Sequence, residues 1–191
     1  MEFEKIKKHI NKGDNVLDIG CGNARLYEYI KSQEINYTGL DNSKTLLNIA
    51  KNRYPDSKFI EADMQKIPTK DEIFDVVTAI ASIHHIPTTK NKIAVIKEIK
   101  RVLKENGTAI ITVWNLFQPK YKKYIWHSRL KALLSFGKYD FRDTFIPWGK
   151  SKVKRYYYAF TQNELRELLI KNGFKIIEEY KGKNFTFICK K

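Results

Sequence analysis

Short apolar runs alternate along the chain with longer segments in which apolar residues recur every three or four positions. The runs at 15–19, 36–40, 58–61, 73–80 and 108–114 have the length and apolar content of strands that are covered on both faces. Most of the segments between them have the spacing of amphipathic helices. Strands that alternate with helices in this way are typical of a parallel sheet between two helical layers. The pattern therefore predicts a doubly wound, Rossmann-like α/β fold.

The helical segments have recognisable ends and apolar stripes. A first helix is expected over 2–11, a second over 24–32, and a long one from 87 to about 104. Asn42-Ser43 can cap a further helix, which ends at 54–56. The side chains expected to be buried on the second helix and on this capped helix are Leu26, Tyr29 and Ile30, and Leu46, Leu47, Ile49 and Ala50.

Residues 115–158 interrupt the alternation and form an insertion after the fifth strand. A helix is expected over 161–172, and a glycine suited to a helix end follows it. Two strands, 174–180 and 184–190, are joined by a very short turn, which predicts an antiparallel hairpin. The whole chain is therefore expected to be one domain, 1–191, with a seven-stranded, mostly parallel sheet, an antiparallel last strand and helices on both faces.

Composition narrows the class of protein. The 191 residues are 42% hydrophobic and 13% aromatic, which is typical of a globular chain with a sizeable core. No run approaches the ~18 to 20 apolar residues of a membrane span, and the first residues lack an apolar signal core, so a cytoplasmic protein is expected. Cys21 and Cys189 match neither a disulfide framework nor a zinc pattern, and no metal site is expected.

The formal net charge of +15 is concentrated in the insertion. Residues 116–158 hold eleven Lys and Arg against two Asp, a net +9, together with 12 of the 25 aromatic residues. Cations suit phosphates and rings suit unpaired bases, so this segment indicates an RNA partner. The alternative is that the aromatic residues form the core of a lid over the cofactor pocket, and the two interpretations are compatible.

The stretch Val16-Leu17-Asp18-Ile19-Gly20-Cys21-Gly22-Asn23 predicts a strand, an acid near its end and a glycine turn into a helix. Gly20 and Gly22 let the backbone turn tightly and approach a ligand closely. The position three after Gly22 is Arg25, which departs from the dinucleotide fingerprint, and Asp18 would repel a pyrophosphate. The turn suits a ligand that carries cations, such as the ammonium and sulfonium of S-adenosylmethionine.

Acids also follow the next two strands, where ligands bind in such sheets. Asp41 is placed to accept hydrogen bonds from both hydroxyls of a ribose, or to cap a helix. Asp63 could accept from an adenine amino group with Met64 packed on the ring, or could be a turn residue. After the fourth strand, the loop from Ala81 to His85 would border the reacting end of the ligand.

The chain resembles the class I S-adenosylmethionine-dependent methyltransferases over roughly residues 14–114. The segments that carry the resemblance are VLDIGCGNA, YTGLD, EADMQKIP, FDVVTAIASIHH and IKEIKRVLKENGTAIITVW. The resemblance implies S-adenosylmethionine as the cofactor. The residues assigned to its site are Asp18, Gly20, Gly22, Asp41, Asp63, Met64 and Ala81.

Further motifs resemble the eukaryotic wobble-uridine tRNA methyltransferases. They are SIHHI, VWN, DTFIPW and RYYYAF, in that order along the chain. The resemblance implies formation of the methyl ester of 5-carboxymethyluridine in the tRNA anticodon, and a small zinc-binding activator subunit at the sheet edge formed by the third strand. The chain departs from the family pattern at Asn23-Ala24-Arg25 and at Tyr158, where histidine is usual, and its insertion is short.

A carboxylate acceptor is already ionised at neutral pH, so the reaction requires donors that hold it and no general base. The candidate catalytic residues are His84, Arg155 and Tyr156, and the candidate substrate-binding residues are Arg25, His85, Trp114, Trp148 and Tyr157. The alternative for His84 is a residue packed in its loop or capping the next helix. Two other functions stay open at this point: a methyltransferase that acts on the oxygen or carbon of a small carboxylate or quinone precursor, and a catalytically inactive RNA-binding module.

Overall fold

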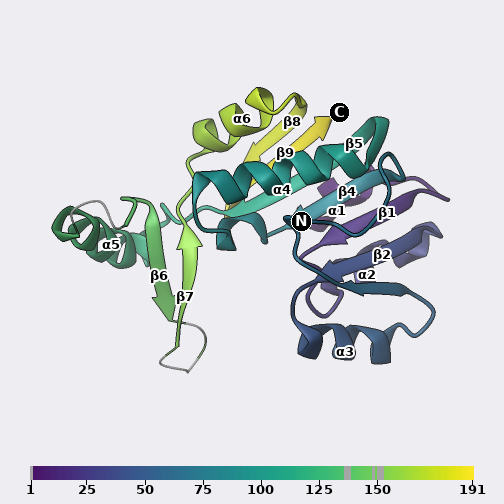
Figure 1. Cartoon of the computed structure of the whole chain (residues 1–191), viewed down its shortest axis with the longest axis horizontal. Coiled ribbons are helices and arrows are strands. Elements are labelled where there is room, and N and C mark those ends of the chain that lie inside the picture. The colour runs from purple at the N-terminus through teal and green to yellow at the C-terminus, as the bar shows by residue number, and fades with distance from the viewer. Residues whose placement is uncertain (1, 136–138, 148, 150–152) are drawn as a thin grey trace.

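A computed structural model of the chain describes residues 2–135, 139–147, 149 and 153–191. Its main sheet has seven strands in the order β3-β2-β1-β4-β5-β9-β8 (Figure 1). The first five strands are parallel, and β9 is antiparallel to both β5 and β8, which confirms the predicted topology. The strands are β1 Asn15–Ile19, β2 Asn36–Asp41, β3 Lys58–Glu61, β4 Phe74–Ile80, β5 Leu103–Trp114, β8 Lys175–Lys181 and β9 Asn184–Lys190.

Helices cover both faces of this sheet. The helices on the first face are α1 Glu2–Lys7, α2 Arg25–Ile30 and α3 Lys44–Arg53, and those on the second are α4 Thr89–Val102 and α6 Gln162–Lys171. Three short 3₁₀ turns, η1 Lys31–Gln33, η2 Ile83–His85 and η3 Pro119–Tyr121, complete the connections. The carboxyl ends of the parallel strands are therefore left free to form a ligand site between the layers.

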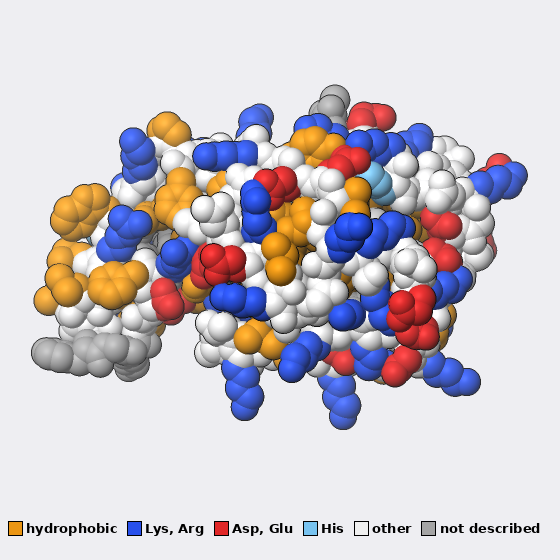
Figure 2. Space-filling view, turned by 90° about the horizontal axis from the view of Figure 1, so that it is seen from above, with side chains coloured by type: hydrophobic (Ala, Val, Ile, Leu, Met, Phe, Trp, Pro, Cys, Tyr) orange, Lys and Arg blue, Asp and Glu red, His pale blue; other side chains and the backbone are white. Residues whose placement is uncertain are grey.

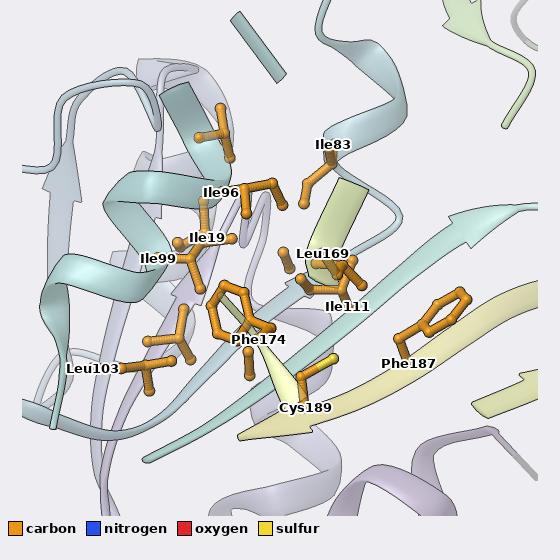
Figure 3. Packing of buried hydrophobic residues seen from close by; sticks show 14 of the residues in the cluster. Ile19, Ile83, Ile96, Ile99, Leu103, Ile111, Leu169, Phe174, Phe187 and Cys189 are labelled. Carbon is orange, nitrogen blue, oxygen red and sulfur yellow. The ribbon is translucent and has the colours of Figure 1, made fainter. Parts of the chain in front are cut away.

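The larger core lies between the sheet and the helices α4 and α6. Ile96 and Ile99 of α4 and Leu169 of α6 pack on Ile19, Ile111 and other fully buried side chains of the sheet (Figure 3). A second core beneath α1 and α2 contains Ile6, Ile30 and strand residues such as Val16 and Ile188. Because apolar side chains are buried on both faces, the central strands form a rigid platform for the loops at their ends.

The segment 62–73 has no helix and is held in place by α4. The Arg101 guanidinium donates to the carbonyl oxygens of Ile67 and Thr69 at 2.8 and 2.9 Å, and the Glu98 carboxylate accepts from the Ile67 amide at 2.7 Å. Charge-assisted hydrogen bonds of this kind are stronger than neutral ones. They fix the loop that follows β3, where Asp63 and Met64 lie.

Two expectations about helix faces are wrong. Tyr29 is 47% exposed, because α2 spans under two turns before the chain tightens into a 3₁₀ turn, and its ring stacks on Phe3 at the surface. Leu46 and Ile49 are 38% and 48% exposed, because α3 covers only the outer strands and buries Leu47 and Ala50 alone. The expected caps at Ser43 and the hairpin at the C-terminus are confirmed.

The insertion forms a lobe to one side of the sheet (Figure 1). It consists of α5 Lys122–Leu134 and an antiparallel hairpin of β6 Asp143–Pro147 and β7 Lys154–Tyr158. The lobe has its own small core of Leu116, Ile125, Ile146, Tyr157 and Ala159. Tyr157 is the one aromatic residue among these buried side chains, and Trp114, Tyr121 and Tyr124 pack against them partly buried. The Lys side chains of the insertion that the structure describes are exposed.

No helix among the described residues is long and apolar enough to cross a membrane. Nor does the described part of the chain bring three or more His, Cys, Asp or Glu side chains together as a group that could hold a metal ion.

Candidate cofactor and substrate site

The glycine turn after β1 is built by close approach of three loops. The amides of Gly20 and Cys21 donate to the carbonyl oxygen of Leu40 at 2.7 and 3.0 Å, so the turn is tied to β2. Gly20 has φ +71° and Gly22 has φ +56°, conformations that favour glycine. A Cβ on Gly20 would lie 2.5 Å from the Ser82 Cβ, so no other residue fits there without displacing the loop after β4.

Ser82 and Met64 face this turn from the neighbouring loops. The Ser82 Oγ is buried and has no hydrogen-bond partner among the described residues. The Met64 methyl lies 3.5 Å from the position that a Gly20 Cβ would occupy. A buried hydroxyl without a partner is costly unless a water or a ligand satisfies it. The glycine cradle, the orphaned hydroxyl and the thioether of Met64 fit a ligand with polar and apolar parts, as S-adenosylmethionine is.

Asp41 holds the glycine turn and the start of α3 at the same time. Its Oδ2 accepts from the Gly22 amide at 2.8 Å, and its Oδ1 accepts from the Ser43 amide at 2.8 Å. A carboxylate has about four acceptor positions, so each oxygen keeps one for a ribose hydroxyl. The N-cap of α3 is Ser43, so Asp41 anchors the segment before the helix and does not cap it. The contact of Asp41 with ribose stays a prediction.

Asp63 is exposed at the end of β3. Its Oδ1 accepts from the Gln65 amide at 2.8 Å, which makes it a turn residue. Met64 is half-buried against the main core and lies next to the glycine turn. The contacts of Asp63 and Met64 with an adenine ring stay predictions.

Asp18 lies beneath the turn and is 2% exposed. Its carboxylate accepts from the Thr78 hydroxyl at 2.7 Å and from the Tyr37 hydroxyl at 3.0 Å. Burial raises the pKa of this carboxyl to about 6, although the two hydrogen bonds oppose the shift. At neutral pH the group is ionised, and it contributes a negative potential under the loop where the cations of the cofactor are expected.

Ala81 ends β4 in a left-handed conformation, with φ +51°. Its amide donates to the carbonyl oxygen of Thr112 at 3.0 Å and to the Thr112 Oγ1 at 2.9 Å. These bonds hold the chain where it leaves the sheet and enters η2. The conformation directs Ser82 toward the glycine turn and His84 toward the insertion.

His84 is fully buried and carries its proton on a defined ring nitrogen. Its Nδ1 accepts from the backbone amide of Trp114 at 3.2 Å, so in the neutral ring the proton is on Nε2. Nε2 is buried and has no partner among the described residues. Burial holds the pKa of His84 well below its usual value. The ring is therefore a neutral N–H donor at the carboxyl end of β4.

Aromatic rings surround His84. Tyr157 stacks on it with centroids 5.4 Å apart, Trp114 stacks on Tyr157 at 5.1 Å, and His85 lies 4.6 Å from Tyr157. His85 is exposed, and its Nδ1 donates to the carbonyl oxygen of Tyr156 at 2.9 Å. The structure thus brings His84, His85, Trp114 and Tyr157 together where the insertion meets the sheet.

Tyr156 points away from this cluster. Successive residues of β7 lie on opposite faces, so Arg155 and Tyr157 share one face and Tyr156 lies on the other. The Tyr156 hydroxyl donates to the Asp143 carboxylate at 2.7 Å. Burial raises the pKa of this hydroxyl, and the hydrogen bond to Asp143 adds to the increase. The geometry therefore favours Tyr157 over Tyr156 as a neighbour of the acceptor. Arg155 is exposed and lies on the same face of the hairpin as Tyr157.

Arg25 does not lie at this cluster. Arg25 is exposed at the first position of α2, with its guanidinium 6.0 Å from the Phe3 ring centroid. Trp148 lies outside the described residues. Ser82 was expected only as part of the loop that borders the reacting end and was given no role of its own, and Thr112 was missed as a site residue. The position of Ser82, directly after the end of a predicted strand, was the available signal, whereas Thr112 could be found only once the pairing of β4 and β5 was known.

Comparisons with known proteins identify the family and the fold. Residues 17–111 match the family model described as a methyltransferase domain. The tRNA (carboxymethyluridine(34)-5-O)-methyltransferase of Schizosaccharomyces pombe is 26% identical over 211 aligned positions, which cover 98% of this chain and 86% of that protein. The protein of the same function from Xenopus tropicalis is 38% identical over 112 positions, 59% of this chain and 17% of that protein.

A solved S-adenosylmethionine-dependent methyltransferase from Methanosarcina mazei has the same fold. It superposes with a TM-score of 0.83 and 20% identity, and the alignment covers 98% of this chain and 96% of that one. The insertion and the main sheet are therefore both contained in a known methyltransferase architecture.

Proposed function

The chain belongs to the class I S-adenosylmethionine-dependent methyltransferases, and we propose that it methylates the carboxylate of a 5-carboxymethyluridine at the wobble position of tRNA. The cofactor, when bound, supplies an electrophilic methyl group on a sulfonium. Asp18, Gly20, Asp41, Asp63 and Met64 would hold the cofactor at the ends of the first three strands. The acceptor would approach from the side of the insertion.

The observation that carries the proposal is the unpartnered Nε2–H of His84 within the described part of the chain. A neutral donor suits an acceptor that must stay nucleophilic, because a hydrogen bond from a cation would draw more charge from the carboxylate. A carboxylate is ionised at neutral pH and needs no proton removed. The chain's own contribution would be to align the acceptor with the methyl group, an effect worth roughly 7 to 11 kcal/mol at best.

Two features support RNA as the molecule that carries the acceptor. The insertion, with its net charge of +9, borders the aromatic cluster that contains His84 and Tyr157. Phosphates would be neutralised by its Lys and Arg side chains, and exposed rings would stack on unpaired bases. The relatives from Schizosaccharomyces pombe and Xenopus tropicalis are named for the same tRNA position.

A partner subunit at the sheet edge is part of the proposal. β3 is an edge strand, and its Phe59 and Ile60 are only partly buried. An uncovered edge with apolar residues invites another chain. The partner expected from the family resemblance is a small zinc-binding activator. Monodisperse and fully active protein expressed alone would argue against it.

Transfer of a labelled methyl group to tRNA tests the reaction and its acceptor together. Purified protein, with and without a co-expressed activator, is incubated with labelled S-adenosylmethionine and tRNA that carries 5-carboxymethyluridine. We expect label in tRNA that mild alkali releases as methanol, because a methyl ester hydrolyses to a carboxylate and methanol. Label that resists alkali would exclude an ester, and label found only in small molecules would favour a small-molecule methyltransferase.

A further inference from the structure

A cavity separate from the glycine turn lies between α5 and the β6–β7 hairpin. Its volume is about 430 Å³, within the range of ~300–1,000 Å³ that small-ligand sites occupy. Its lining includes Lys123, Tyr124, His127 and Lys131 of α5, Phe145 of β6 and Lys154 of β7. None of these side chains belongs to the site built around His84.

The charge of this cavity is unbalanced. Lys123, Lys131 and Lys154 bring three ammonium groups to it, and no Asp or Glu among the described residues lines it. None of the ion pairs found in the described part of the chain involves these lysines. Asp143, on the same hairpin, has its carboxylate engaged by the Tyr156 hydroxyl and the Asp140 amide. Like charges gathered in one cavity repel one another until an anion enters.

The cavity also offers groups suited to a nucleotide. The Lys131 ammonium lies 4.9 Å from the centroid of the Phe145 ring, so the cation and an aromatic face are adjacent. His127 Nδ1 lies 2.6 Å from the carbonyl oxygen of Lys123, to which it can only donate, so Nε2 is the ring nitrogen available to a ligand. Tyr124 supplies a second ring.

We propose that this α5 pocket, formed by Lys123, Tyr124, His127, Lys131, Phe145 and Lys154, binds a phosphate group of the RNA substrate. The ammonium groups neutralise the phosphate, and the adjacent base packs on an aromatic ring of the pocket. The inference rests on the proposed function, because it takes RNA as the molecule that supplies the phosphate.

The strand pairing places the α5 pocket and the His84 cluster on opposite faces of the β6–β7 hairpin. Phe145 pairs with Tyr156 and Thr144 pairs with Tyr157, so Phe145 and Tyr157 lie on opposite faces of the hairpin. The α5 pocket uses the Phe145 face, and the His84 cluster uses the Tyr157 face. A nucleotide held on the Phe145 face is therefore not the one that is methylated beside His84.

A titration without tRNA tests the pocket itself. Inorganic phosphate and uridine 5′-monophosphate are added to the full chain, and the ring NMR signals of Tyr124 and His127 are followed. We expect saturable shifts, with tighter binding of the nucleotide. The double variant Lys123→Gln with Lys154→Gln should lose them, whereas the control Lys120→Gln with Lys122→Gln, which removes the same charge from the same lobe outside the pocket, should keep them.

Signals that do not saturate, or a control pair that loses the shifts as fully as the pocket pair, would overturn the proposal. With tRNA, the pocket pair should weaken binding at least tenfold and the control pair less than threefold. The pocket pair should also reduce the slope of log affinity against log salt by about 0.7 for each phosphate that the protein no longer neutralises.

The two proposals fail in different ways. If the wild-type protein methylates tRNA and the pocket pair binds tRNA as the control pair does, the α5 pocket is refuted and the proposed function stands. If phosphate and nucleotide bind in the pocket but the wild-type protein methylates no tRNA, the proposed function is refuted and the phosphate site stands.

Discussion

At the scale of single residues, the protonation of two buried groups decides what the site can do. His84 stays a neutral donor because its Nδ1 accepts from the Trp114 amide and its ring is buried. Asp18 titrates with a pKa of about 6 because burial penalises its charged form. In the proposed reaction the neutral His84 would donate to the acceptor, and the titration of Asp18 would set the pH at which the negative potential under the glycine turn disappears.

Replacing His84 by Phe removes the donor while keeping a ring that can stack on Tyr157. We expect the rate of methyl transfer to fall about 10- to 100-fold, since a hydrogen bond to a charged group is worth about 1.5–3 kcal/mol. Affinity for S-adenosylmethionine, measured by calorimetry, should be unchanged. A variant that transfers methyl groups normally, or that no longer binds the cofactor, would contradict the role assigned to His84.

Asp18 should make cofactor binding depend on pH. Above pH 6 the carboxylate is ionised and attracts the cations of the cofactor. Below pH 6 we expect the affinity to weaken by up to about tenfold per pH unit, as proton linkage requires. In Asp18→Asn, affinity should be low and flat between pH 5 and 7. Calorimetric titrations across this range measure it, and a flat profile in the wild-type protein would refute the assignment.

Lowering the pH should raise the unfolding free energy of the ligand-free protein through Asp18, although it weakens cofactor binding. Burial in the folded protein raises the pKa of the Asp18 carboxyl from an ordinary value of 3.8 to about 6. The stabilisation that this carboxyl provides is therefore complete below pH 4 and is lost as the pH rises through 6. Relative to Asp18→Asn, the ligand-free wild-type protein should lose about 3 kcal/mol of unfolding free energy over this interval. Urea unfolding at pH 4 and pH 7 gives both values.

At the scale of elements, the turn after β1 and the β6–β7 hairpin have different structural roles. The turn brings the loops after β1, β3 and β4 to one place, as the close approach of Ser82 and Met64 to Gly20 shows. The hairpin joins the insertion to the sheet through Tyr157, which stacks on both His84 and Trp114.

Gly20→Ala should abolish cofactor binding, because its Cβ would lie 2.5 Å from the Ser82 Cβ. Gly13→Ala is the matched control, since Gly13 also has a positive φ, +83°, but has nothing within 4 Å of an added Cβ. The control should cost only about 1–2 kcal/mol of stability and should bind the cofactor normally. Equal cofactor affinity in the two variants would show that the close approach at Gly20 is unimportant.

Tyr157→Ala should detach the hairpin from the sheet. Removing a fully buried aromatic side chain costs about 3–5 kcal/mol, and tRNA methylation should fall with it. Tyr156→Phe, on the opposite face, removes only the hydrogen bond to Asp143 and should cost about 1 kcal/mol. Urea unfolding and methyl transfer measure the two variants. The reverse order of effects would contradict the assignment of faces.

The sequence predicted the strands of the main sheet and the helices that cover it, but not α5 or the β6–β7 hairpin of the insertion, and not which faces of the short helices are buried. Alternation of apolar runs predicted a mostly parallel sheet, because buried parallel strands leave a strong signal, whereas the edge position of β3 was expected together with the family resemblance. The apolar pattern failed at Tyr29, Leu46 and Ile49, because short helices on the outer strands have little sheet to cover. Lys92, 2% exposed with its ammonium 3.0 Å from the centroid of the Tyr158 ring, could not be predicted, since the contact depends on how the hairpin packs on α4.

For the site, too, the sequence predicted some features and not others. Acids and glycines at strand ends could be read from the sequence, because every strand of a parallel sheet ends at the same edge. The choice between Tyr156 and Tyr157 could not, since it depends on the register between β6 and β7. Nor could the proton position on His84, which depends on the backbone amide of Trp114 at the end of the neighbouring strand.

At the scale of the whole molecule, two kinds of surface meet. A methyltransferase sheet offers its strand ends to the cofactor, and a basic lobe extends from one side of it (Figure 1). Lys and Arg side chains are spread over the visible face, and the left end, formed by the insertion, combines them with hydrophobic side chains (Figure 2). Such a surface suits a large, flexible polyanion better than a small apolar substrate.

Salt should therefore weaken the complex with tRNA strongly. Each phosphate contact adds about 0.7 to 0.9 to the slope of log affinity against log salt, and several contacts give a steep decrease in affinity between about 50 and 200 mM. Filter binding or fluorescence anisotropy at a series of salt concentrations measures the slope. A nearly flat response would argue against phosphate contacts by the insertion.

The central claim is tested most directly by mass spectrometry of tRNA nucleosides from a strain that lacks this protein. We expect 5-carboxymethyluridine to accumulate there and its methyl ester to disappear, and we expect the ester to return with the wild-type chain but not with His84→Phe. Unchanged levels of the methyl ester in the deletion strain would contradict the account.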